Sequence, residues 1–127
     1  MASTGRGVSS KTALLTERLI GFAVTIIDIV ETLPDNRLGN HIRAQLLRPG
    51  SSPAPNYAEA VSAESRKDFI HKLGVALKEL RETHVWLCII KRKQLITKRD
   101  LLEFGLNECN ELIAIFAASV ATAKENL

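Results

Sequence analysis

Carboxylate side chains at helical spacing are the first candidates for chemistry in this sequence. Glu79 and Glu82 lie three residues apart, and Asn56 and Glu59 repeat that spacing. Bundle proteins that hold two irons combine such Glu ligands with Glu-x-x-His pairs from facing helices. The sequence contains no Glu-x-x-His, which argues against a ferritin-like site. We therefore expect Asn56 and Glu59 to cap or brace the end of the second helix, with a subunit contact as the alternative.

His84 and Cys88 are the other candidate pair, because residues four apart share a helix face and both side chains ligate zinc. Zinc needs two further ligands, and Cys109 is expected about 10 Å away along the facing helix, too far for a disulfide. We expect both cysteines to be reduced core residues. The sequence holds no nucleophile elbow, phosphate-cradling glycine loop or His-x-x-x-His motif. It therefore predicts no catalytic residue, no metal and no other cofactor.

A basic cluster is the strongest charge feature of the chain. The protein has 127 residues and a net charge of +3, from 17 Lys and Arg against 14 Asp and Glu. Five of the cations lie within nine residues: Lys91, Arg92, Lys93, Lys98 and Arg99. Such a cluster binds phosphates by releasing counterions, but Lys and Arg also complement the negative end of a helix. No aromatic residue lies among them to stack on a base, so a solvated helix end and a nucleic-acid site both stay open.

Four amphipathic segments must position these residues. Apolar residues recur at steps of three and four over residues 15–33, and Pro34 ends the pattern. A second helical segment continues past a proline-dense stretch at 49–55, which predicts a kink or short break there. Two longer segments follow, each about 25 residues and each opened by a capping pattern, the first at Ser65 and the second at Thr97.

This spacing predicts an all-α fold, an antiparallel up-and-down four-helix bundle with a kinked second helix. Residues 11–127 are expected to form the bundle, after a flexible tail at residues 1–10 that is small and polar. The tail lacks the apolar core of a signal peptide. The longest uncharged apolar-rich run, residues 112–123, is shorter than a membrane span. We therefore expect a cytoplasmic protein without a membrane partner.

The first helix is apolar on two sides. At about 100° per residue, Ile20, Val24 and Ile27 fall on a second stripe opposite the main one. The rest of the monomer covers this stripe if the helix is central. Another subunit covers it if the stripe is an interface, as exposed apolar patches usually are. We favour an oligomer interface at these three residues.

Two sequence elements carry a resemblance to a known family. The first is Asn56, Ala58, Glu59 and Ala60 at the end of the second helix, and the second is the run 69–79. With them, residues from about 15 to 120 resemble the bacterial four-helix bundle proteins encoded by intervening sequences in 23S ribosomal RNA genes, also named the S23 ribosomal protein family. The resemblance implies an all-α bundle that assembles as a homopentamer, and it implies little about activity.

One relative in that family, the accessory variability determinant of diversity-generating retroelements, is a strongly basic pentamer that binds nucleic acid and a reverse transcriptase. This sequence departs from it in being only mildly basic, and from the commoner family pattern in its prolines at 49, 53 and 55. We expect a non-enzymatic, pentameric scaffold that binds a macromolecular partner, with a protein favoured over RNA or DNA. The alternative is a nucleic-acid-binding accessory factor that uses the basic cluster.

Overall fold

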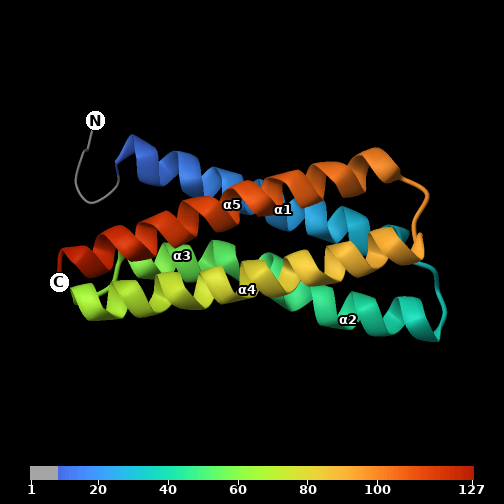
Figure 1. The fold of residues 1–127 in the computed structure, drawn as a ribbon, viewed down its shortest axis with the longest axis horizontal. Coiled ribbons are helices and arrows are strands. Elements are labelled where there is room, and N and C mark those ends of the chain that lie inside the picture. Colours follow the sequence, from blue (N-terminus) through green and yellow to red (C-terminus); the bar gives the residue numbers. More distant parts are fainter. Residues whose placement is uncertain (1–8) are drawn as a thin grey trace.

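The computed structural model describes residues 9–127, which are helical with no strand among them. Figure 1 shows α2 and α3 following one another along one side of the bundle, antiparallel to α1 and to α4. The predicted all-α, up-and-down four-helix bundle with a kinked second helix is confirmed. The helices are α1 (Ser10–Thr32), α2 (Arg37–Ser51), α3 (Pro53–Val61), α4 (Arg66–Lys93) and α5 (Arg99–Glu125).

α1 begins with a side-chain cap and ends before a proline. The Ser9 hydroxyl accepts a hydrogen bond from the Thr12 N–H at 3.0 Å, which satisfies one of the free donors of the first turn. Leu33, which precedes Pro34, is extended. Residues 1–8 of the predicted tail lie outside the described residues, whereas Ser10, also assigned to the tail, is the first residue of the helix.

The predicted kink lies at Ser52, between α2 and α3. Pro49 sits inside α2, while Pro53 opens α3 and has no N–H to donate. Ser52 keeps helical geometry, with φ −66° and ψ −30°, and its N–H donates to the Arg48 carbonyl at 2.9 Å. The two helices therefore follow one another without a loop.

α4 begins as the sequence predicts, because the Ser65 hydroxyl accepts a hydrogen bond from the Asp68 N–H at 3.1 Å. It ends at Gln94, which adopts a left-handed conformation with φ 54° and ψ 50°. The Leu95 N–H donates to the Ile90 carbonyl at 3.1 Å, the hydrogen bond of a Schellman motif. This reversal turns the chain toward α5.

The predicted Thr97 cap is wrong. α5 begins at Arg99, so Lys98 occupies the capping position, and no side chain caps the first turn. The Thr97 carbonyl accepts the Arg99 N–H at 2.9 Å instead. The buried side chain of Ile96 closes the end of the core just before this turn, which fixes where the helix can start.

One apolar core runs through the bundle. It is tight where α2 crosses α1, because a Cβ at Gly50 would lie 2.7 Å from Cγ2 of the buried Ile26. Tyr57 and Phe116 meet edge to face, with ring centroids 5.7 Å apart. Within residues 9–127 no helix has both the length and the hydropathy to cross a membrane. The largest fully buried side chains are Phe22, Phe116, Leu19, Ile26, Ile29, Ile42, Leu46, Leu73, Leu80, Leu87, Ile90 and Leu112.

Candidate functional site

The second apolar side of α1 faces outward. Ile20, Val24 and Ile27 are 44%, 50% and 39% exposed, while the opposite side of the helix is buried. The interpretation that the rest of the monomer covers these residues is therefore wrong. The helix packs on α2, α3 and α5 through one side only, and a partner that covers the other side stays a prediction.

Phe104 on α5 is a further exposed apolar side chain, at 58%. Its neighbour Gly105 packs against α1, since a Cβ there would lie 3.0 Å from Cδ1 of Ile29 and 3.6 Å from Cγ2 of Thr25. Phe104 therefore lies on the part of α5 that packs against α1. Sequence reasoning missed this residue, although its position off the main apolar stripe of the last helix was a usable signal.

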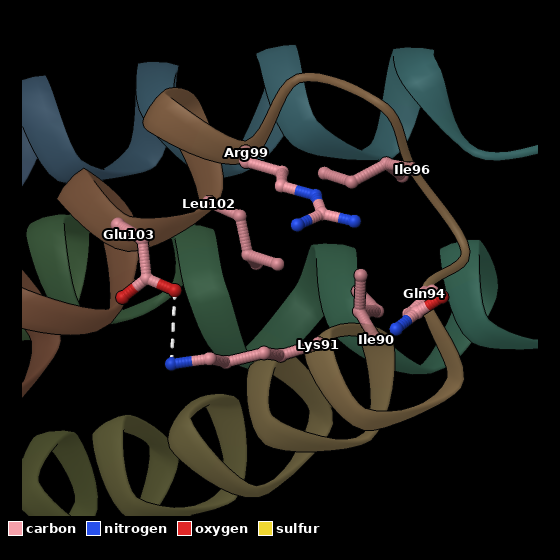
Figure 2. A pocket seen from close by; sticks show the side chains of 7 residues that line it. All are labelled: Ile90, Lys91, Gln94, Ile96, Arg99, Leu102 and Glu103. Carbon is pink, nitrogen blue, oxygen red and sulfur yellow. Dashed lines mark ion pairs between the residues drawn. The ribbon is translucent and has the colours of Figure 1, made fainter.

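The basic cluster lies at the end of the bundle where α4 passes into α5, and its five side chains are exposed. The structure pairs one of them, because Nζ of Lys91 lies 2.9 Å from Oε2 of Glu103. Figure 2 shows this ion pair at the edge of a small pocket, with the Arg99 guanidinium extending across it. The pocket has a volume of about 180 Å³ and is lined by Ile90, Lys91, Gln94, Ile96, Arg99, Leu102 and Glu103.

The other four basic side chains have no ion-pair partner in the part of the chain that the structure describes. Within residues 9–127, Arg92, Lys93, Lys98 and Arg99 have no carboxylate within ion-pair distance. A surface with four free cations can attract a polyanion. It offers no exposed aromatic side chain among them for base stacking, so its interaction would be with phosphates.

Asn56 of the family-like element braces α3 against α4. Its Nδ2 donates to Oε1 of Glu79 at 2.6 Å, and Nη1 of Arg48 donates to Oε2 of the same carboxylate at 3.0 Å. Burial raises the pKa of Glu79, and the hydrogen bond from Asn56 and the charge of Arg48 oppose that rise. The brace joins two helices and the end of α2, so the predicted structural role of Asn56 fits this geometry.

Ala58 and Glu59 of the same element make no such brace among the described residues. Ala58 and Glu59 are exposed on α3, and Glu59 makes no ion pair with any described residue. The Glu59 carbonyl accepts the Ser62 N–H at 3.1 Å, where α3 ends. The Glu59 side chain therefore stays a candidate for a subunit contact.

The His84 and Cys88 pair does not assemble a metal site. Sγ of Cys88 lies 3.7 Å from Nδ1 of His84, but residues 9–127 contain no group of three His, Cys, Asp or Glu side chains placed to hold a metal. Cys109 is buried and donates its S–H to the Leu80 carbonyl at 3.3 Å. Burial raises the pKa of this thiol to about 12, so the thiolate that reacts or binds metal is suppressed.

An ion-pair cluster that sequence reasoning missed holds α1 to α5. The Arg18 guanidinium makes two hydrogen bonds to Glu108, at 2.9 and 2.7 Å, and one to Glu111 at 2.9 Å. These hydrogen bonds raise the pKa of Arg18 above its ordinary value. Because the partners are about ninety residues apart in sequence, no local pattern could have shown the contact.

Comparison with known proteins agrees with this fold. Residues 13–118 match the family model of the 23S rRNA-intervening sequence protein. The chain is also similar to a crystal structure of a protein of unknown function from the S23 ribosomal protein family of Bacteroides thetaiotaomicron, with 32% sequence identity and a TM-score of 0.78. That similarity covers 87% of this chain and 98% of the other. A comparison with curated proteins found no match.

Proposed function

This chain belongs to the 23S rRNA-intervening sequence protein family, and we propose that it is a non-enzymatic homo-oligomer, a pentamer, that serves as a scaffold for a macromolecular partner. The family and the similar structure carry no assigned activity. The side chains suited to chemistry lie in a brace, an ion-pair cluster or the core, which supports a binding role over catalysis.

The observation that carries the proposal is the exposed apolar side of α1. Ile20, Val24 and Ile27 are about half exposed, and fully burying such a side chain contributes about 1.5–3 kcal/mol. Covering what is still exposed therefore contributes about 1 kcal/mol per residue at each subunit contact. A closed ring repeats that contact once per subunit, which is how a modest patch supports a stable assembly.

Val24→Asp tests this role. A charge in the centre of the patch has no partner on α1 and is costly to bury, so we expect the assembly to dissociate while the helical circular dichroism is kept. Leu127→Asp is the matched control, because Leu127 is exposed at the end of the chain. Light scattering after size exclusion measures both masses. An assembly that Val24→Asp leaves intact would contradict an interface at this patch.

A second candidate function is binding of nucleic acid at the basic cluster. The specific observation in its favour is that four of its five cations are exposed and unpaired within the described chain. In a ring, symmetry repeats this surface on every subunit, and the fields of the copies add. Phosphate contacts of this kind depend on salt, with a slope of log K against log salt of about −0.9 per contact on duplex DNA.

Fluorescence anisotropy with labelled RNA and duplex DNA, at several salt concentrations, tests this second function. Changing Lys93, Lys98 and Arg99 to Gln is expected to weaken binding and to flatten the salt dependence. Changing Lys11 and Lys124 to Gln is the control, because both lie away from the cluster. This function would be ruled out if the changes at Lys93, Lys98 and Arg99 leave binding unaltered, or if the wild type does not bind.

A further inference from the structure

The outward side of α1 carries acidic residues at both ends of its apolar patch. Glu17 precedes the patch, and Asp28 and Glu31 follow it, all on the same exposed side. None of the three carboxylates has an ion-pair partner within residues 9–127. We name this surface the α1 stripe; its members are Glu17, Ile20, Val24, Ile27, Asp28 and Glu31.

The outward side of α4 has the opposite charge around a second apolar patch. Val85 and Ile89 are 56% and 40% exposed. Steps of three and four residues place Lys78, Arg81 and Arg92 on the same exposed side. These cations also lack an ion-pair partner in the described chain. We name this surface the α4 stripe; its members are Lys78, Arg81, Val85, Ile89 and Arg92.

The two stripes lie on different sides of the molecule. In the described residues α1 contacts α2, α3 and α5, whereas α4 contacts α2, α3 and α5, and α1 and α4 do not contact each other. They are the diagonal pair of the bundle. One chain therefore cannot join its own stripes, but two copies can.

The stripes match in length and in chemistry. Each extends over fifteen residues, 17–31 and 78–92, which is about 21 Å along a helix. In each, apolar side chains lie at the centre and charges at both ends, as in the apolar core and polar rim of a protein interface. Opposite charges across such a contact favour the correct partner, and like charges exclude the wrong one.

We infer that the α1 stripe of one copy packs against the α4 stripe of the next, in a head-to-tail contact between identical chains. A two-fold contact of the α1 stripe with itself sets acid against acid, and the α4 stripe with itself sets base against base. When two copies meet through two different surfaces, one α1 stripe and one α4 stripe remain uncovered at the two ends of the pair. Further copies can therefore add until the assembly closes into a ring. This inference rests on the proposed homo-oligomer and specifies its contact.

Reversing the charges on one stripe, and then on both stripes together, tests whether the two stripes pair. Changing Glu17 and Glu31 to Lys is expected to weaken assembly at least tenfold, and so is changing Lys78 and Arg92 to Glu. A chain that carries all four changes again has opposite charges across the contact and is expected to assemble. Changing Glu64 and Glu125 to Lys is the control, since both are exposed outside the stripes. Failure of the fourfold variant to recover assembly, while it stays helical, would overturn the pairing.

Cysteine cross-linking tests it independently. In a Cys88→Ser background, position 20, 24 or 27 is changed to Cys together with position 85 or 89, in all six pairings. Oxidation is expected to give a ladder of covalent oligomers for at least one pairing and no covalent dimer for any single change. A covalent dimer from a single change indicates a two-fold contact and overturns the inference, as does the absence of a ladder for all six pairings in an oligomeric protein. A monomeric wild type instead overturns the proposed function itself.

Discussion

Replacing Asn56 with Ala removes one hydrogen bond from a carboxylate that the fold has buried. The Asn56 amide donates to Oε1 of Glu79 at 2.6 Å, while Arg48 contacts the other oxygen at 3.0 Å from a largely exposed position. Asn56 is therefore the partner held within the packed helices. Without the Asn56 amide, the buried Glu79 carboxylate has fewer hydrogen bonds to replace those it makes to water in the unfolded chain. We therefore expect Asn56→Ala to destabilise the fold.

The expected cost follows from the kind of hydrogen bond. A hydrogen bond to a charged group contributes about 1.5–3 kcal/mol, more than a neutral one. For a chain of this length, 1 kcal/mol corresponds to about 4 °C in melting temperature, so the variant is expected to melt about 6–12 °C lower at pH 7. The loss of stability caused by Asn56→Ala should be smaller in acid, because a protonated, uncharged Glu79 gains less from the hydrogen bond that Asn56 donates.

Urea denaturation followed by circular dichroism measures the effect. All variants are compared at one protomer concentration, because assembly adds to stability by mass action. Asn56→Asp is the matched variant: it keeps the shape of the side chain but replaces the donor with a carboxylate facing Glu79. We expect it to be less stable than Asn56→Ala at pH 7, and the difference between the two to narrow in acid.

A double-mutant cycle decides whether the effect comes from this contact. Glu79→Met removes the charge and keeps much of the volume, so adding Asn56→Ala to it should cost at least about 1 kcal/mol less than in the wild type. Equal costs in the two backgrounds would refute the reasoning. A lower oligomer mass for Asn56→Ala would instead assign this residue to a subunit contact, the alternative that the sequence left open.

Three more substitutions test other parts of the account. Glu79→Gln should gain stability relative to the wild type as pH rises above about 4.3, the ordinary glutamate pKa. The reason is that the raised pKa of Glu79 makes the folded wild type retain a proton that the unfolded chain has already released, so the wild type loses stability over this range. Urea denaturation at pH 4 and pH 7 measures the difference in stability between the two proteins, and an unchanged difference would contradict this prediction. Gln94 has a left-handed backbone conformation that glycine adopts without strain, so Gln94→Gly should stabilise the fold by up to about 1 kcal/mol. An unchanged or lower urea midpoint would argue against this. Gly50→Ala places a methyl group 2.7 Å from Ile26 and should cost about 1–3 kcal/mol, whereas Gly74→Ala meets nothing within 4 Å; equal melting temperatures would show that α1 and α2 tolerate separation.

The helices were predictable because local spacing determines them. Pro34 and the Ser65 cap act on the backbone next to them, and both mark helix ends in the structure. The Thr97 pattern failed because the buried Ile96 and the turn at Gln94 decide where α5 starts. These two constraints come from the packing of α4 on α5, which a local capping pattern does not contain.

The contacts between helices were not predictable in the same way. The exposed side of α1 was found from spacing alone, since Val24 lies opposite the residues that fill the core. The brace from Asn56 to Glu79 and the ion pair from Lys91 to Glu103 depend on which helices become neighbours. A helical pattern gives the direction of a side chain but not the partner that packing brings to it.

The mass of the wild-type protein in solution tests the central claim most directly. We propose that the exposed side of α1, centred on Val24, is covered by another copy of the chain. Sedimentation equilibrium at micromolar concentration is therefore predicted to give a closed assembly of about five times the 14.0 kDa chain mass, unchanged over a tenfold dilution. A single species of 14.0 kDa at that concentration would contradict the account.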